Sequence, residues 1–442
     1  MPRSALVLAI LGAFLLASCE GQRGSHASVK SSVEYELRQI HAIDNHAHPM
    51  KAVGQGEEDH EYDALPVEGI PSFALPTVFS EGNPYFPQAW HTLFGYRYSD
   101  SKPEHLAELE KAKRDLAKQK GDLYPSWVLN QANTEIMLAN RVAMGRGLPS
   151  DRFKWVPFAD MFLFPLNNES YKAKDPDHDV FFGREEKLLK GYMANAQMQK
   201  LPVSFDDYLT FVSHQLESWK SGGAVAFKFE LAYLRDLDIG NPQKENAERV
   251  YSIYSQSSAP SDDEYKMVQD YVFRHIAHEA GRLGLPVHFH CALGAGSYFR
   301  DATGNSLALE PLFNDPGMRK TNFVLLHGGW PFTKESALMI LKPNVYLDFS
   351  AFEYFAYPSQ AARDIRLFLE SAPEKVLYGS DASPWGGDVG WEETAWIGSN
   401  NGRQALGLAL TAMIDDGEIS EDRAKEIAHM VMRENARRLY RF

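Results

Sequence analysis

Two histidines, His46 and His48, lie two residues apart just after the short apolar run Ile40–Ile43. Residues i and i+2 of a β-strand point to the same face, so both imidazoles can reach one ion. Three later apolar runs end in a side chain of similar chemistry, and these side chains are His290, His327 and Asp381. Zinc binds histidine nitrogen and aspartate oxygen, and a catalytic zinc site keeps one position open for water. The pattern favours such a site over isolated structural histidines.

Eight short apolar segments alternate with helical ones along the chain. After the strand that ends near His46 and His48, we expect strands at 135–139, 154–164, 224–229, 285–289, 322–326, 345–349 and 376–378. This alternation predicts an α/β fold, a (β/α)8 TIM barrel of parallel strands. The active site of such a barrel lies at the C-terminal ends of the strands, and the candidate groups follow strands one, five, six and eight.

Helical signals fill the intervals between the strands. Ser261 and Glu264 have capping-box spacing, apolar residues recur every four positions from Val268 to Ile276, and Gly284 ends the pattern. Further helices are expected at 32–39, 103–120, 204–221, 361–370 and 421–439.

A long irregular region follows strand one. Residues 50–100 are rich in proline, glycine and aromatic residues and show no clear periodicity. Such long loops are uncommon unless they are functional, although a packing insertion is the alternative. We therefore expect one barrel over residues 33–442, with residues 50–122 inserted as a cap or lid over the site.

The N-terminal segment has the composition of an export signal. Arg3 precedes an apolar run, Ala5–Leu16, that is too short to span a bilayer, and Cys19 ends a small-residue cleavage site. Residues 16–19 look like a bacterial lipobox, and an ordinary signal peptide with an incidental cysteine is the alternative. We expect a signal peptide over residues 1–18 and a lipidated tether over residues 19–32. Because Glu20 replaces the aspartate of an inner-membrane retention signal, the expected location is the outer membrane, facing the periplasm.

The overall composition excludes several classes of function. The chain has 442 residues, of which 44% are hydrophobic and 24% charged, and its net charge is −14. An acidic surface without a basic cluster argues against a nucleic-acid partner and against membrane binding other than through the lipid anchor. Two cysteines imply no disulfide framework. The expected partner is a small-molecule substrate, and the oligomeric state is left open.

Several segments around the candidate groups resemble a known family. These segments are Leu285–His290, Leu326–Pro331, Asn344–Phe349, Tyr378–Ala382 and Glu434–Tyr440. With the histidine and aspartate pattern they are similar to the amidohydrolase superfamily, in the branch called amidohydrolase family 2. The likeness covers strand one and the chain from about residue 220 onward. Residues 50–200 carry few of its motifs, so the resemblance implies no substrate.

The resemblance implies a role for each candidate group. His46, His48 and His290 would bind a divalent metal ion, with Zn²⁺ favoured, and Asp381 would complete the site. Asp381 would also take a proton from water and pass it to the leaving group. His327 would polarise the substrate or steady the attacking hydroxide.

Two basic residues are candidates for substrate binding. Lys228 is unusual because it lies inside an apolar strand. As an ammonium it would bind a substrate carboxylate. As a carbamate, which two-metal members of the superfamily use, it would bridge two ions, and His327 would complete the second site. One ion is favoured, and two are possible through Lys228. Arg235 can grip a carboxylate with two hydrogen bonds, or it can form a surface salt bridge.

These features predict a metal-dependent hydrolase. It would activate water for attack on a C–N or C–O bond of a small molecule, such as an amide, a lactone or an ester. A non-oxidative, metal-dependent decarboxylase with the same ligands is the first alternative. A non-catalytic binding lipoprotein is the second, although a binding protein has no need of an open metal position.

Overall fold

The computed structural model describes residues 30–54, 56–65, 78, 82–256, 259–291 and 294–442. It contains strands at the predicted positions, most of them shorter than expected. The strands are β1 (Ala42–Ala47), β2 (Thr134–Asn140), β3 (Phe153–Val156), β4 (Phe227–Phe229), β5 (Val287–Phe289), β6 (Phe323–Leu325), β7 (Val345–Asp348) and β8 (Val376–Leu377).

The strands form two parallel sheets that are joined at both edges. Strand order is β1-β2-β3 in one sheet and β4-β5-β6-β7-β8 in the other. Parallel bridges from Trp155 to Ala224 and from Phe158 to Lys228 join the β3 side to the β4 side. A parallel bridge from Ala47 to Ala382 joins β1 to the residues that follow β8. The predicted α/β fold of the (β/α)8 TIM-barrel type is confirmed.

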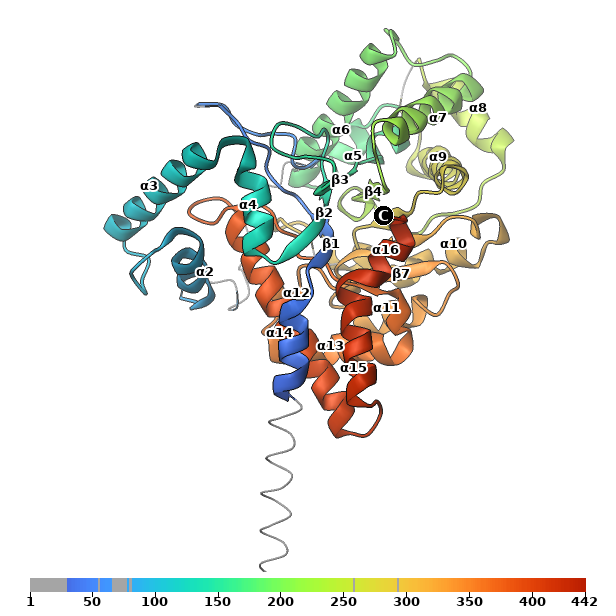
Figure 1. Ribbon diagram of the computed structural model, residues 1–442. Coiled ribbons are helices and arrows are strands. Elements are labelled where there is room, and N and C mark those ends of the chain that lie inside the picture. The colour runs from blue at the N-terminus through green and yellow to red at the C-terminus, as the bar shows by residue number, and fades with distance from the viewer. Residues whose placement is uncertain (1–29, 55, 66–77, 79–81, 257–258, 292–293) are drawn as a thin grey trace, which may run out of the picture.

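Helices surround the strands (Figure 1). They are α2 (Tyr85–Phe94), α3 (Pro103–Lys120), α4 (Tyr124–Gln131), α5 (Glu169–Lys172), α6 (Pro176–Asn195), α7 (Phe205–Ser221), α8 (Lys244–Tyr254), α9 (Asp262–Leu283), α10 (Glu310–Asn314), α11 (Thr333–Met339), α12 (Phe352–Phe355), α13 (Pro358–Ser371), α14 (Trp391–Asp415), α15 (Glu421–His429) and α16 (Asn435–Tyr440). With helices on the outside and side chains filling the inside, the strands are buried on both faces; all six residues of β1 are buried.

Helix α9 follows its local signals closely. Ser261 accepts from the backbone of Glu264, and the Glu264 side chain accepts from the backbone of Ser261, so both halves of the capping box are present. Gly284 ends the helix with φ 71°, a left-handed conformation that favours glycine. Val268, Val272 and Ile276 are fully buried. The prediction of this helix and its limits is confirmed.

Two predicted elements differ from the structure. The third strand was expected to run through residue 164, but β3 ends at Val156 and residues 160–163 form a 3-10 turn. Pro157 has no N–H to donate, which limits further pairing. The last helix was expected as one piece over 421–439, but a π-helical segment, Met430–Glu434, separates α15 from α16.

The insertion after β1 packs against the barrel through an apolar cluster. Figure 1 shows α2 and α3 to one side of the strands. Phe86, Trp90 and Leu109 of the insertion are buried in one cluster with Tyr354 and Ile397, which come from α12 and α14. Residues 66–77 and 79–81 of the predicted lid lie outside the described part of the chain.

The predicted export signal is also outside the described residues. The signal peptide over residues 1–18 and the lipidated Cys19 therefore stay predictions. Residues 30–32, the end of the predicted tether, are described and belong to a helix over residues 30–39. Among the described helices, none combines the length and the apolar character needed to cross a bilayer.

Candidate active site

The first two candidate ligands come from the end of β1. His46 lies within the strand, and His48 follows its last residue. The Nε2 atom of His46 is 3.1 Å from Oδ1 of Asp381, and the Nε2 atom of His48 is 3.6 Å from the same oxygen. The two imidazoles therefore converge on one carboxylate, as the spacing of two residues predicts.

Asp381 and His327 stand at the ends of β8 and β6 in unusual backbone conformations. Their φ angles are 54° and 60°, in the left-handed region that few residues other than glycine adopt. Strained backbone of this kind clusters at functional sites. The Nδ1 atom of His327 is 3.9 Å from Oδ2 of Asp381, and His46, His327 and Asp381 each offer a ligand atom within 4.8 Å of the others.

The glycines after His327 serve packing as well as backbone geometry. A Cβ on Gly328 would lie 2.7 Å from the Phe352 ring, and a Cβ on Gly329 would lie 1.9 Å from Oγ of Ser336. Both glycines have positive φ. The Gly-Gly pair therefore allows the loop after β6 to lie against its neighbours.

His290 follows β5 and completes the group. Its Nδ1 atom is 3.1 Å from Nε2 of His327, and its ring centroid is 4.8 Å from that of Tyr233. The structure thus brings together all five residues that the sequence selected for metal binding and catalysis, at the C-terminal ends of four strands.

Burial keeps three of the site histidines neutral. It lowers the pKa of His46 and of His327 well below the usual range, and it lowers the pKa of His48 to about 4. Burial also raises the pKa of Asp381 well above its ordinary value. Neutral imidazoles are the form that binds metal. A cation beside Asp381 would favour its ionised form, so the electrostatics suit a metal centre.

A hydrogen-bond network that the sequence did not indicate supports His327. Oδ1 of Asp348 accepts from the His327 backbone at 2.9 Å and from Oγ of Ser350 at 2.7 Å, and Oγ of Ser350 lies 2.9 Å from Nδ1 of His327. Asn45 donates to the other Asp348 oxygen at 2.6 Å. Asp348 falls within a segment that carries the family resemblance, but its partners come from three separate strand ends.

A second group of possible ligands lies on the other edge of the His48 ring. The Nδ1 atom of His48 is 3.0 Å from the carbonyl oxygen of Tyr62 and 3.5 Å from Oδ2 of Asp63. His48, Asp63 and Glu230 each offer a ligand atom within 4.8 Å of the others. Sequence reasoning missed both carboxylates. Glu230 lies two residues after Lys228. The i, i+2 spacing of a strand, which placed His46 and His48 on one face, could therefore have placed Glu230 beside Lys228.

Lys228 is fully buried on β4. Its Nζ atom has no hydrogen-bond partner among the described residues. Its charge contributes to lowering the pKa of His46, after the larger effect of burial. The charge of Lys228 therefore acts on the candidate metal centre.

Arg235 is engaged elsewhere. Its guanidinium lies 2.5 Å from Oδ1 of Asp270, and its side chain is 7% exposed. The pair is buried, whereas the alternative considered from the sequence was a surface salt bridge. Arg235 also lines a cavity of about 430 Å³ with Tyr233, whose ring contacts His290. The structure does not join Arg235 to the five metal and catalytic candidates, and its role in substrate binding stays a prediction.

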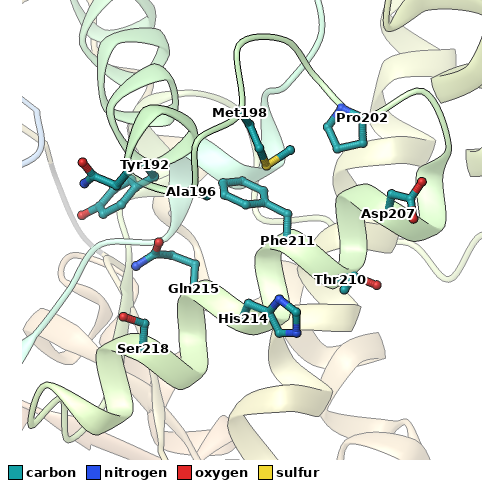
Figure 2. Close-up of a pocket in the computed structure, with 11 residues that line it drawn as sticks. Tyr192, Ala196, Met198, Pro202, Asp207, Thr210, Phe211, His214, Gln215 and Ser218 are labelled. Atoms are coloured by element: carbon teal, nitrogen blue, oxygen red, sulfur yellow. The ribbon is translucent and has the colours of Figure 1, made fainter.

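A larger hollow of about 650 Å³ lies between α6 and α7. Figure 2 shows Tyr192 and Ala196 from the end of α6 facing Phe211 and Gln215 of α7. None of the predicted site residues lines this hollow. The chemistry indicated by the histidines belongs to the barrel centre instead.

Residues 244–442 match the amidohydrolase family model. This span includes His290, His327 and Asp381, and it ends with the chain. Protein fluG of Emericella nidulans is 26% identical over 231 residues, which cover 49% of this chain and 25% of fluG. The chain thus spans about a quarter of the length of this curated relative.

Solved structures with low sequence identity share the fold. Glucuronate isomerase from Caulobacter crescentus superposes with a TM-score of 0.61 at 11% identity, over 94% of each chain. Uronate isomerase from Thermotoga maritima gives 0.60 at 11% identity, over 93% of this chain and 97% of the other. A candidate metal-dependent hydrolase from Lactobacillus casei ATCC 334 gives 0.51 at 17% identity, over 92% and 96%. These similarities support the barrel fold over most of the chain.

Proposed function

We propose that this protein belongs to the amidohydrolase superfamily and is a metal-dependent hydrolase. Its reaction is the attack of water on a C–N or C–O bond of a small molecule, such as an amide, a lactone or an ester. The observation that carries the proposal is the convergence of His46, His48, His290, His327 and Asp381 at the C-terminal ends of barrel strands. The match of residues 244–442 to the amidohydrolase family supports it.

The donor set fits a divalent cation. His46, His48, His290 and Asp381 would hold it, through the nitrogen and oxygen ligands that zinc accepts. Nε2 of His46 and Nε2 of His48 lie 3.1 Å and 3.6 Å from Oδ1 of Asp381, so two imidazole nitrogens and one carboxylate oxygen face one position. A bound Zn²⁺ would act as a Lewis acid and lower the pKa of water toward neutrality.

The residues of the chain then have distinct tasks. The Asp381 side chain is 19% exposed, more than the 1% of His46, so it remains open to substrate. Its carboxylate takes the proton from the attacking water and delivers it to the leaving group. His327, held by Ser350 through Nδ1, orients a donor group of the substrate through Nε2, the nitrogen that contacts His290 in this structure. The Lys228 ammonium attracts a substrate carboxylate.

The insertion over residues 50–122 is proposed as a cap over this site. Tyr354 packs in the insertion's apolar cluster, and its hydroxyl donates to the carbonyl oxygen of Asp381 at 3.3 Å. Movement of α2 and α3 would therefore reach the backbone of the proposed base through a single side chain.

We also propose that the protein is exported and anchored by a lipid on Cys19. Its proposed location is the outer membrane, where it faces the periplasm. The support is the sequence of residues 1–20 alone.

A substrate screen with purified, zinc-loaded protein tests the reaction. Amides, lactones and esters of small organic acids are incubated in ¹⁸O-labelled water, and the products are analysed by mass spectrometry. A hydrolase should place ¹⁸O in the acid product, and Asp381→Asn should lower turnover by more than about a hundredfold. Release of carbon dioxide would establish the decarboxylase instead, and saturable binding without turnover would establish the binding protein.

A further inference from the structure

Four acidic side chains gather beside the edge of His48 that faces away from Asp381. Asp63 comes from the loop after β1, Asp160 from the turn after β3, Glu185 from α6 and Glu230 from the end of β4. Asp160 and Glu185 are 1% exposed and Glu230 is 5% exposed. We propose that this acidic cluster holds a second divalent cation, bound by the carboxylates of Asp63 and Glu230 next to His48.

An unpartnered buried atom points to a missing ligand. Oε2 of Glu230 has no hydrogen-bond partner among the described residues. A buried carboxylate without a partner is costly, and native proteins rarely leave one unless an ion or a water satisfies it. The Lys228 ammonium is near, but it does not hydrogen bond to this oxygen in the described part of the chain. One ammonium group cannot balance several ionised carboxylates, so a bound divalent cation would stabilise their ionised form.

The geometry suits one ion. The ligand atoms that His48, Asp63 and Glu230 offer lie within 4.8 Å of one another. Oxygen ligands of a divalent cation stand roughly 2.0–2.6 Å from it, so opposite ligands are separated by about 4–5 Å. A site rich in carboxylate oxygen favours hard cations such as Mn²⁺ or Mg²⁺ over the zinc expected beside the histidine nitrogens.

Asp160 positions one of the ligands. Both of its oxygens accept from the backbone N–H of Glu230, at 3.0 Å and 2.9 Å. These bonds hold Glu230 where its side chain meets Asp63. Glu185 shares the burial and the charge of the cluster, but it is outside the group of three ligand atoms. A Glu185 variant therefore shows whether metal affinity depends on the ligands themselves or only on the negative charge of the cluster.

This site differs from a two-metal centre bridged by Lys228 and completed by His327. His327 belongs to the group on the Asp381 side of the centre. The acidic cluster meets the opposite edge of the His48 ring, where Asp63 lies 3.5 Å from Nδ1. Binding here does not depend on which reaction the first centre catalyses, so it can be measured without turnover.

Metal titration tests the second site. The full-length protein is stripped with a chelator, loaded with one equivalent of Zn²⁺ and titrated with Mn²⁺. Free Mn²⁺ is followed by electron paramagnetic resonance, and both metals are counted by mass spectrometry. We expect one Zn²⁺ and one Mn²⁺ per chain. Glu230→Gln and Asp63→Asn should each weaken Mn²⁺ binding by more than about tenfold while zinc is retained, because each variant removes one charged ligand of few.

Two further variants serve as controls, with circular dichroism to confirm folding. Glu185→Gln should change Mn²⁺ affinity by less than about threefold, since it removes charge but no ligand. Lys228→Met should keep the second ion. The proposal is overturned if wild-type protein binds no Mn²⁺ beyond the first ion, or if Glu185→Gln weakens binding as much as Glu230→Gln. Loss of the second ion in Lys228→Met, or loss of zinc together with Mn²⁺ in Glu230→Gln, also overturns it.

Discussion

Ser350 determines which nitrogens of two site histidines carry protons. An ionised carboxylate only accepts hydrogen bonds, so the Ser350 hydroxyl donates to Asp348 at 2.7 Å. Its oxygen then accepts from an N–H at Nδ1 of His327, at 2.9 Å. The neutral His327 ring has its lone pair on Nε2, which accepts from Nδ1 of His290 at 3.1 Å. The chain of bonds thus leaves the lone pair of His290 on Nε2, where a metal ion can use it.

We therefore predict that Ser350→Ala weakens zinc binding although Ser350 is not a ligand. Removing the direct partner of a metal-binding histidine typically costs about 10–100-fold in affinity, and Ser350 acts on His290 one residue further out, through His327, so we expect a loss of about tenfold or less. The variant also leaves the buried N–H of His327 without its acceptor, which costs about 1–3 kcal/mol of unfolding free energy. Zinc affinity is measured by competition with a chromophoric chelator, and stability is measured by urea unfolding of the metal-free protein.

Ser399→Ala is the matched control. The Ser399 hydroxyl on α14 is also buried, donates to the carbonyl oxygen of Ala132 at 2.6 Å and accepts from Nε of Arg403 at 3.2 Å. We expect a similar loss of stability and unchanged zinc affinity, because its partners are not site histidines. Wild-type zinc affinity in Ser350→Ala, or equal weakening in Ser399→Ala, would refute the argument.

Four further predictions test the remaining assignments. His46→Ala, His48→Ala and His290→Ala should each lose bound zinc and turnover, whereas His327→Ala should lower the rate with a smaller loss of zinc; equal zinc content in all four variants would contradict the ligand set. Asp381→Asn should lower turnover by more than about a hundredfold, measured under single-substrate steady state, because general-base catalysis is lost. Cys19→Ser should move the protein out of the membrane fraction, and an unchanged distribution on immunoblots would contradict the anchor. Burial lowers the pKa of His288 to about 3, so as pH falls below about 6.5 the proton binds to the unfolded chain before it binds to the folded protein. Between pH 7.5 and pH 5 the free energy of unfolding of the wild type should therefore fall by about 2 kcal/mol more than that of His288→Gln.

Local signals predicted the elements whose limits depend on neighbouring residues in the chain. The capping box at Ser261 and the left-handed Gly284 define α9 without help from distant contacts. The third strand was predicted too long because apolar residues continue past Pro157. Those residues are buried, but by packing in the main core, as Phe162 and Leu163 show. Apolar character alone does not distinguish a strand from a buried turn.

Some residues of the candidate site were likewise predictable from the sequence and others were not. His46 and His48 were predictable because strand geometry places both on one face, and the other groups because they share the end of a strand. Asp63 and Ser350 were not predictable. Asp63 reaches the centre from the insertion, and Ser350 acts through Asp348 on a histidine of another strand. Arg235 looked like an anion-binding residue because the sequence does not reveal that Asp270, 35 residues away, is its partner.

The seam of the barrel and the proposed metal centre are the same place. The backbone N–H of Asp381 donates to the carbonyl oxygen of His46 at 2.7 Å, and that of His48 donates to the carbonyl oxygen of Ala382 at 2.7 Å. These two bonds join β1 to the residues after β8. The residues that make them, His46 and His48, are also the ones whose side chains converge on one oxygen of Asp381. The distance between the first and last ligands in the chain is therefore set by the closure of the barrel. A barrel that fails to close loses the centre, and a metal ion held by His46 and Asp381 would in turn hold the two edges together. Metal binding should accordingly stabilise the fold by a free energy that rises with the logarithm of the metal affinity, because an ion bound by the native state alone shifts the unfolding equilibrium.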